Sequence, residues 1–323
     1  MCAGAMSIAS PRDPGLFRLA HSVPNVPFTT RWARKHGLAP HVLTRLVEQG
    51  VLRRMLRGVY VDALVPDTTD LRIRAIALVA PPGSVVCDWT ACWVWTGLDS
   101  PGSHLVVPRP AIFRFRGQDR TRHGGVRSGE RWFLPSDVLP IADGLFITTP
   151  IRTAWDMGRF AHRYVAIGAM DALMRFDGFS LDELVHGVPR FAKQRGVVQL
   201  RELAFVVDPR SESIGESAVR LHWLEIPGAP TPVPQVPVLI GGRELRLDLG
   251  VEEIKYAAEY DGETFHSEDE DRDHDRARRA AIEDVHGWTI DVLRKVHVFG
   301  QQANVKSILS SGIARAESGE DAN

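Results

Sequence analysis

The fold is decided by two short segments, Leu-Arg-Leu-Asp-Leu-Gly at residues 245–250 and Tyr-Ala-Ala-Glu-Tyr-Asp-Gly-Glu-Thr-Phe-His at residues 256–266. Each has the pattern of an apolar strand with acidic residues, namely Asp248 in the first segment and Glu259 and Asp261 in the second. Because side chains alternate along a strand, Glu259 and Asp261 should project from the same face. Converging carboxylates repel one another unless a cation lies between them, and oxygen ligands of this kind suit Mg²⁺. The pattern therefore predicts metal-dependent phosphodiester chemistry.

The neighbouring segments predict the order α-β-β-β-α-β-α. A helix is expected to begin at Ser211, and Gly241-Gly242 predicts a hairpin between two strands. Strands are expected over residues 235–240, 244–249, 253–261 and 289–293, and the remaining helices over 270–285 and 301–313.

With Glu216 in the first helix, this order resembles the PD-(D/E)XK nuclease superfamily, most of all the branch related to very-short-patch-repair endonucleases. Glu216 matches the helix glutamate of that branch, Gln235 a glutamine that opens the strand pair, and Asp248 the metal-binding aspartate. The other matches are Glu259, Asp261, Gly262 and His266 to an E-x-D-G-x-x-H block, and Asp275, Arg276, Arg279, Gly287 and Trp288 to its continuation.

The resemblance implies a catalytic set made of Glu216, Asp248, Glu259, Asp261 and His266. Asp248 and Glu259 are expected to bind Mg²⁺, and Glu216 to complete the coordination through a water. His266 would orient a water or protonate the leaving oxygen, or it would merely cap the strand end.

Two arginines, Arg276 and Arg279, are the expected phosphate ligands, since a guanidinium group is a planar bidentate donor. The alternative is that they pair with Asp273 and Asp275 on the helix surface.

One position departs from the superfamily pattern: Asp261 stands where its lysine is expected, although the very-short-patch-like branch commonly has Asp there. Lys255 is expected on the same face of the strand, but about 13 Å away along an extended chain. The catalytic cation would then come from an arginine or His266, or the fold would serve only as a binding platform.

The N-terminal part is strongly basic, because residues 31–57 carry six arginines and one lysine against the single acid Glu48. Helices are expected over 31–36 and from Pro40, followed by β segments over 51–56 and 58–61. This is the order of a winged helix-turn-helix, whose second helix enters the major groove while the hairpin rests on phosphates. The expected DNA contacts are made by Arg45, Arg53, Arg54 and Arg57.

Residues 28–61, including Leu-x-Arg-x-x-Arg-Gly-Val-Tyr at 52–60, resemble the N-terminal winged-helix domain of AbiEi-type antitoxins. Members of that family repress their own operons and neutralise nucleotidyltransferase toxins. The resemblance therefore implies DNA as a first partner and a cognate nucleotidyltransferase-type toxin as a second. A solvated basic surface without a partner is the alternative.

The middle part shows no catalytic constellation. Strands are expected at 104–108 and 145–148, and helices at 151–159, 164–176, 180–187 and 190–207. The arginine- and aromatic-rich stretch 113–126 would grip nucleic acid, or form an edge strand kept soluble by charge. Residues 147–159 resemble the middle segment of actinobacterial proteins that join an AbiEi-like head to a nuclease-like tail.

The composition, with 44% hydrophobic and 24% charged residues in a chain of 323, is that of a globular protein. Three cysteines cannot form a disulfide framework, and neither a membrane span nor a signal peptide is indicated, so a cytoplasmic location is expected.

We therefore expect an α+β multi-domain protein. Its parts would be a flexible N-terminus (1–26), a winged helix (27–99), a mixed α/β spacer (100–209), a PD-(D/E)XK endonuclease-like α/β core (210–316) and a disordered tail (317–323). The expected function is DNA binding coupled to a Mg²⁺-dependent endonuclease-like domain, in a bacterial defence, mobile-element or toxin–antitoxin setting. The alternative is a non-enzymatic AbiEi-type repressor and antitoxin with a degenerate nuclease fold.

Overall fold

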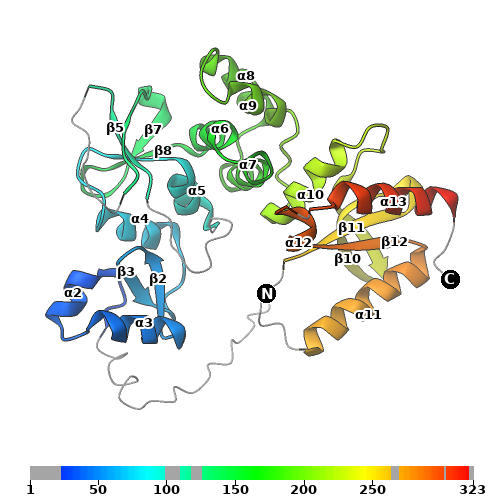
Figure 1. The fold of residues 1–323 in the computed structure, drawn as a ribbon, viewed down its shortest axis with the longest axis horizontal. Coiled ribbons are helices and arrows are strands. Elements are labelled where there is room, and N and C mark those ends of the chain that lie inside the picture. Colours follow the sequence, from blue (N-terminus) through cyan, green and yellow to red (C-terminus); the bar gives the residue numbers. More distant parts are fainter. Residues whose placement is uncertain (1–22, 99–109, 118–125, 263–268, 302, 320–323) are drawn as a thin grey trace. The chain divides into compact units, whose positions relative to one another are not determined.

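The computed structural model describes residues 23–98, 110–117, 126–262, 269–301 and 303–319, with the backbone alone at 143 and 269–277 (Figure 1). The protein is of mixed α+β type and divides into two compact units, Met1–Thr153 and Ala154–Asn323. The boundary lies within helix α6 (Pro150–Phe160), so the segments expected as a spacer at 100–209 are shared between the units. No helix in the described ranges is long and apolar enough to cross a membrane.

The first part of unit 1 has the expected helix, helix, hairpin order. Thr29 caps the first helix by accepting a hydrogen bond from the Trp32 N–H, and Gly58 makes the hairpin turn with a φ of 78°. The strands form a sheet of order β1-β3-β2, and Leu43 and Leu46 of the second helix are buried together with Leu52 of the sheet. The elements are β1 (Phe28–Thr29), α2 (Thr30–Lys35), α3 (Pro40–Glu48), β2 (Leu52–Leu56) and β3 (Val59–Asp62).

A second sheet of short strands completes unit 1, with the order β6-β5-β4-β8-β7. The strand expected at 104–108 lies outside the described residues. The elements are α4 (Thr69–Ala77), β4 (Val85–Val86), α5 (Asp88–Thr96), β5 (Ile112–Phe115), β6 (Glu130–Arg131), η1 (Pro135–Asp137), β7 (Val138–Pro140), η2 (Ala142–Gly144) and β8 (Phe146–Thr148).

Arginines in and beside the stretch 113–126 are engaged within unit 1. Arg127 and Arg131 both form ion pairs with the buried Asp88 carboxylate, and the Arg131 guanidinium lies 4.4 Å from the centre of the Phe113 ring. Arg114 donates to the Pro82 carbonyl at 2.7 Å. Strand β5 lies between β4 and β6, so the described part of this stretch is not the edge strand that was one of the two expectations; residues 118–125 are not described.

Unit 2 begins with a group of helices. The single helix expected over 190–207 is wrong: Lys193 and Gly196 have φ values of 62° and 78°, which a helix cannot accommodate. Gly196 is required because a Cβ there would lie 2.0 Å from the Arg159 carbonyl oxygen. The helices are α7 (Arg163–Asp177), α8 (Leu181–Gly187), η3 (Val188–Phe191), α9 (Val197–Ala204) and α10 (Ile214–Leu224).

Helices α7 and α10 are locked together. Asp171 and Arg220 form a buried ion pair of 2.7 Å. Gly168 permits close contact, because a Cβ there would lie 2.8 Å from the Ile214 Cα. Since breaking a buried pair is costly, this contact fixes the position of α10.

The C-terminal part of unit 2 has the expected strand and helix order. Its sheet has the order β12-β11-β10-β9, in which only the β11–β12 pairing is parallel. The elements are β9 (Val233–Ile240), β10 (Arg243–Val251), η4 (Glu252–Ile254), β11 (Tyr256–Asp261), α11 (Asp269–His286), β12 (Thr289–Arg294), α12 (Lys295–Val298) and α13 (Val305–Ser318).

Several boundaries differ from the prediction, including helix starts at Ile214 and Val305 where residues 211 and 301 were expected. The third strand begins at Tyr256 instead of Glu253, because η4 precedes it and Lys255 has a φ of 52°. Lys255 is therefore not on the strand. The terminal helix continues to Ser318, so the disordered tail expected from residue 317 is wrong at its start.

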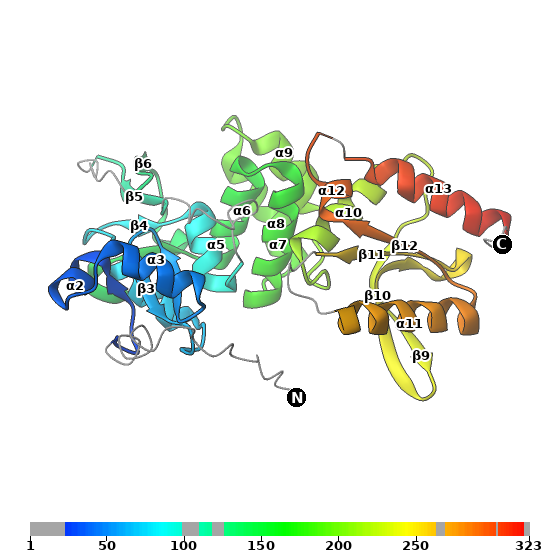
Figure 2. The same ribbon diagram turned by 60° about the horizontal axis from the view of Figure 1, so that its bottom comes forward.

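Helices cover both faces of this sheet (Figure 1). On the face of α10 and α13, Trp223, Leu249 and Tyr256 are buried together. On the face of α11, Leu247, Ile282 and Trp288 form a second cluster. Figure 2 shows the β9–β10 hairpin extending past α11. The result is a three-layer α/β/α arrangement, in which the strand ends can carry polar residues.

A polar cluster surrounds the C-terminal end of α10. Glu225 accepts a hydrogen bond from the Tyr164 hydroxyl at 3.0 Å and forms ion pairs with Arg163 and Lys306, each at 2.8 Å. His222 is buried and stacks on the Tyr164 ring, with 3.8 Å between centroids. Neither ring nitrogen of His222 has a hydrogen-bond partner within the described part of the chain. Burial lowers the pKa of His222 to about 4.

Replacing His222 by Phe should flatten the pH dependence of stability in acid. His222 is neutral when folded, whereas its pKa in the unfolded chain is about 6.5. The unfolded chain therefore gains a proton first as the pH falls, and the wild type should lose about 1.5 kcal/mol of its free energy of unfolding between pH 6.5 and 5 from this group. Phe keeps the stack on Tyr164 and cannot be protonated. Urea unfolding of the full chain at several pH values measures the difference.

The matched control is His186→Phe, since His186 lies exposed on α8. It should keep the wild-type pH dependence. If the free energy of unfolding depends on pH in the same way in wild type and in His222→Phe, His222 is not held neutral in the folded protein.

Candidate functional site

Strand pairing brings Asp248 and Glu259 next to each other. The antiparallel register of β10 and β11 pairs Leu249 with Ala258, and Asp248 and Glu259 are the next residues on each strand. The backbone N–H of Tyr260 donates to Asp248 Oδ2 at 2.8 Å, which holds the aspartate side chain against β11. Opposed residues of such a pair have Cβ atoms about 5 Å apart. The two acids that the sequence singled out are therefore neighbours.

Glu216 reaches the same region from the first turn of α10. Ser213 caps this helix by accepting the Glu216 N–H at 3.1 Å. Gly215 lets the helix approach β11, because a Cβ there would lie 2.0 Å from the Tyr260 ring. Gln235 then donates to Glu216 Oε2 at 3.1 Å. The glutamine picked out by resemblance thus orients the helix glutamate.

The pKa of Asp248 shows that the charges of the three carboxylates interact. Burial, together with the negative charges of Glu216 and Glu259, raises the pKa of Asp248 to about 7. The Tyr260 N–H and Arg278 oppose this change. Burial also raises the pKa of Glu216. No ion pair to Glu216 or Asp248 is found among the described side chains, so their repulsion is relieved only in part.

Glu259 differs from the other two acids because it is neutralised by α11. Its side chain is buried; Arg278 Nη2 lies 2.6 Å from Oε1 and Arg279 Nη1 lies 3.3 Å from Oε2. Arg278 also donates to the Arg246 carbonyl on β10 at 3.3 Å. Arg279 was expected at the site, whereas Arg278 was missed and the side chain of Arg276 is not described.

A helical signal could have revealed Arg278. Ile282 is fully buried against the sheet, and Arg278 lies four residues before it, on the same face of α11.

Of the remaining expected catalytic residues, only Asp261 is described, and it does not pair with this group. Asp261 is exposed at the end of β11, with its nearest described cation Arg294 on β12 at 3.7 Å. His266 lies outside the described residues. Lys255 pairs with Glu252 at 3.6 Å and lies over the Trp288 ring at 5.2 Å, so it does not supply the missing lysine.

The donor set fits a hard cation in its chemistry. In the described parts of the chain, no three His, Cys, Asp or Glu side chains are arranged to hold a metal ion as they stand. Glu216, Asp248 and Glu259 nevertheless offer carboxylate oxygens alone, which Mg²⁺ prefers. The raised pKa of Asp248 reports crowding of negative charge that a divalent ion would relieve.

The basic residues of unit 1 fall into two kinds. Arg45, Arg54 and Arg57 are exposed on α3, on β2 and at the hairpin turn. Arg53 is only half exposed; it donates to the Val65 carbonyl at 3.1 Å and lies 3.9 Å from Asp67. Arg53 thus fixes the segment after β3, which makes it a poorer candidate for a DNA contact than its neighbours.

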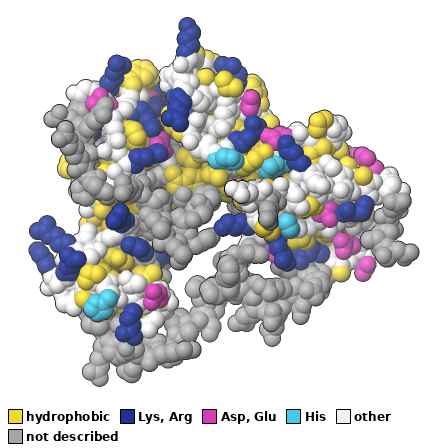
Figure 3. Space-filling view, in the orientation of Figure 1, with side chains coloured by type: hydrophobic (Ala, Val, Ile, Leu, Met, Phe, Trp, Pro, Cys, Tyr) yellow, Lys and Arg dark blue, Asp and Glu magenta, His cyan; other side chains and the backbone are white. Residues whose placement is uncertain are grey.

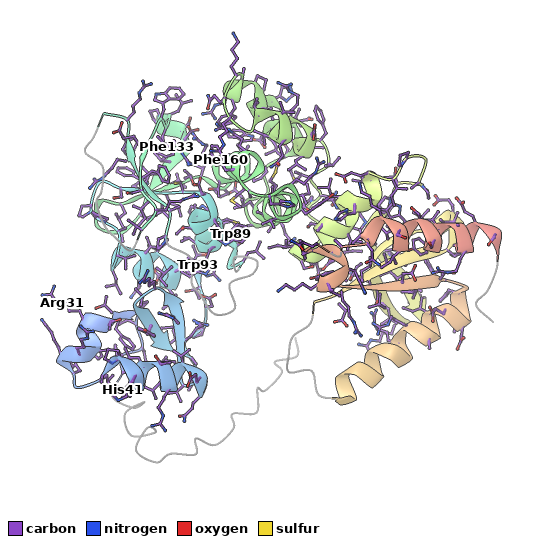
Figure 4. All side chains as sticks on the ribbon, in the orientation of Figure 1. Arg31, His41, Trp89, Trp93, Phe133 and Phe160 are labelled. Carbon is purple, nitrogen blue, oxygen red and sulfur yellow. The ribbon has the colours of Figure 1, made fainter. Side chains whose placement is uncertain are left out.

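The surface over the first two helices is basic. Figure 3 shows Lys and Arg side chains gathered over α2. In Figure 4, Arg31 and His41 project from α2 and α3. Arg31, Arg34 and Lys35 are all exposed. An anionic partner is therefore the best electrostatic match for this surface.

The chain matches no known family profile. Two proteins of Mycobacterium tuberculosis, the uncharacterized proteins MT2308 (strain CDC 1551 / Oshkosh) and Rv2248 (strain ATCC 25618 / H37Rv), are each 30% identical to it over 252 residues. The matched region is 76% of this chain and 86% of each relative. The chain belongs to the family of these two proteins.

A solved structure, that of the RV2827C protein from Mycobacterium tuberculosis, aligns with 60% of this chain and 76% of its own at 15% identity. Its TM-score of 0.29 is too low to support an inference about fold or function.

Replacing Asp248 by Asn should stabilise the protein. The amide keeps an oxygen that accepts the Tyr260 N–H, but it removes a buried charge that Glu216 and Glu259 repel. We expect a gain of about 1–2 kcal/mol in the free energy of unfolding at pH 8. Urea unfolding in EDTA measures it, since the chelator excludes compensation by bound metal.

Asp261→Asn is the control, because this exposed residue should change stability by less than about 0.5 kcal/mol. Destabilisation of Asp248→Asn would argue against repulsion between the carboxylates.

Proposed function

We propose that this protein binds DNA and carries a Mg²⁺-dependent endonuclease-like centre in unit 2. The observation that carries the proposal is the pairing of Asp248 with Glu259 on adjacent strands, within the field of Glu216. This arrangement supports the resemblance to very-short-patch-repair-like PD-(D/E)XK endonucleases. The helix, helix, hairpin order of unit 1, with exposed Arg45, Arg54 and Arg57, supports a winged helix that binds DNA.

Asp248 and Glu259 would hold the metal ion, which supplies a polarised phosphate and a water of lowered pKa when bound. Glu216, oriented by Gln235, would accept a hydrogen bond from a water near the ion. Arg279 and Arg278 would offer guanidinium donors to the phosphate as its negative charge grows.

A second candidate function is that of a non-enzymatic AbiEi-type repressor and antitoxin. The position of Lys255 favours it, because this lysine is held by Glu252 and Trp288, and Asp261 occupies the lysine position of the motif. In that case unit 2 would be a binding platform, with a cognate nucleotidyltransferase-type toxin as the expected partner. Both candidates fit a cytoplasmic setting of bacterial defence, mobile elements or toxin–antitoxin pairs.

The endonuclease proposal predicts Mg²⁺-dependent nicking of supercoiled plasmid by the purified full chain, with none in EDTA. Asp248→Asn should reduce the rate at least about 100-fold, because it removes a metal ligand. Since the same variant should fold more stably than wild type, the loss cannot be ascribed to unfolding. Agarose gel assays of the supercoiled form measure the rate.

Glu253→Gln provides a matched control, as this exposed acid lies in η4 away from the carboxylate group. It should nick at the wild-type rate. If neither wild type nor Asp248→Asn cleaves supercoiled, linear or single-stranded DNA in Mg²⁺ or Mn²⁺, the repressor is the better proposal.

The winged-helix proposal predicts that Arg57→Ala weakens DNA binding several-fold at all sequences. Loss of one phosphate contact should also reduce the slope of log affinity against log salt by about 1. Fluorescence anisotropy with a labelled duplex at several salt concentrations measures both. Arg74→Ala serves as the control, because Arg74 is an exposed arginine of α4 that pairs with Asp70. If Arg57→Ala and Arg74→Ala behave alike, the hairpin does not contact DNA.

A further inference from the structure

We propose that Arg278 and Arg279 form a latch on Glu259. A divalent cation must displace these arginines in order to bind Glu259, and the released guanidinium groups then bind the DNA phosphate. The inference rests on the proposed function, since it concerns the regulation of the same centre. It assigns to α11 a role that the sequence resemblance does not give, namely that its arginines occupy the metal's ligand before the metal arrives.

The geometry places the latch on one carboxylate of the three. Glu259 is engaged through both of its oxygens, by Arg278 at 2.6 Å and by Arg279 at 3.3 Å. Glu216 and Asp248 receive hydrogen bonds from uncharged donors, the Gln235 amide and the Tyr260 N–H. Glu259 is therefore the only described member of the group whose charge is already neutralised, and a cation can gain it only in competition with arginine.

The contact of Arg278 with the sheet makes the latched position specific. Its second guanidinium nitrogen donates to the Arg246 carbonyl on β10, the strand that also carries Asp248. The planar guanidinium thus bridges the two strands of the site, a geometry that a lysine could not reproduce. With side chains 24% and 23% exposed, Arg278 and Arg279 also retain a path to solvent and to a ligand that comes from it.

Charge balance gives the reason for release. When all three carboxylates are ionised, they and the two guanidinium groups leave a single negative charge, which a divalent ion would reverse to a single positive one. An excess positive charge in a partly buried site favours the departure of a guanidinium from Glu259 and its pairing with an anion. A phosphodiester brings that anion, and it restores neutrality. Metal and DNA should consequently bind with positive coupling through Arg278.

The latch predicts effects of opposite sign for one substitution. In Arg278→Gln, Mn²⁺ should bind about tenfold more tightly than in wild type, because the competing cation is gone. The gain in DNA affinity that Ca²⁺ gives to the wild type should be lost in the same variant, because the phosphate donor is gone. Mn²⁺ binding to the full chain is followed by electron paramagnetic resonance, and DNA affinity by anisotropy with and without Ca²⁺.

Two further variants make the test decisive. Arg246→Gln removes the same charge near the site, but its side chain is 59% exposed and pairs with Glu244, so it controls for general electrostatics. Arg278→Lys keeps the positive charge but lacks the planar guanidinium group that donates through two nitrogens. It should bind Mn²⁺ with an affinity between those of wild type and Arg278→Gln. Thermal unfolding by circular dichroism confirms that each variant is folded.

The outcomes separate the latch from the metal centre. If Asp248→Asn abolishes Mn²⁺ binding while Arg278→Gln has the affinity of wild type or of Arg246→Gln, the centre stands and the latch is overturned. If wild type binds no Mn²⁺, or Asp248→Asn binds it equally well, the metal centre fails and the latch with it. Tighter Mn²⁺ binding together with loss of the Ca²⁺-dependent gain supports the latch.

Discussion

Repulsion between carboxylates that folding forces together is the constraint on which unit 2 depends. The register that pairs Leu249 with Ala258 brings Asp248 beside Glu259, and no rearrangement of side chains can separate two residues so placed. Helix α10 adds Glu216, and its position is set by contacts that are structural: the Asp171–Arg220 ion pair and the close approach of Gly215 to Tyr260. The cost of the acid group is therefore met by the stability of the surrounding core.

Local signals were sufficient for most of the fold. Gly241-Gly242 predicted its hairpin and has the positive φ values of a turn, and Thr29 was expected to cap a helix and does so. The helix expected from Ser211 begins three residues later, after the Ser213 cap. The errors arose where the pattern of residue types continued through a break in the backbone. Glu253 and Ile254 alternate like a strand, yet the turn η4 and the left-handed Lys255 precede β11. Such a φ at a lysine is imposed by packing, which the sequence does not display.

The site was predictable to the extent that its residues lie on strands. Asp248 and Glu259 were identified from spacing, because a strand has a period of two and a hairpin has a definite register. The arginines were predicted less well. Arg276, Arg278 and Arg279 all lie on α11, and their chemistry is identical; the two whose side chains are described both contact Glu259, on the helix face that buries Ile282 against the sheet. Which face of a charged helix packs on the sheet depends on tertiary contacts. A helix with few apolar residues specifies that face only weakly.

Strand β11 carries no lysine at the position where the resemblance predicts one, and Arg278 and Arg279 pair with Glu259 instead. Asp261 lies exposed near Arg294, and Lys255 is held by Glu252, so the cation that the superfamily motif places on the strand is absent from that position in the described part of the site. Positive charge reaches the carboxylates from α11 instead. A guanidinium on a helix differs from an ammonium on a strand in that it can leave its carboxylate without disturbing the sheet. Under the endonuclease proposal this difference makes metal binding and phosphate binding interdependent, whereas under the repressor proposal the same arginines serve only to neutralise a buried acid.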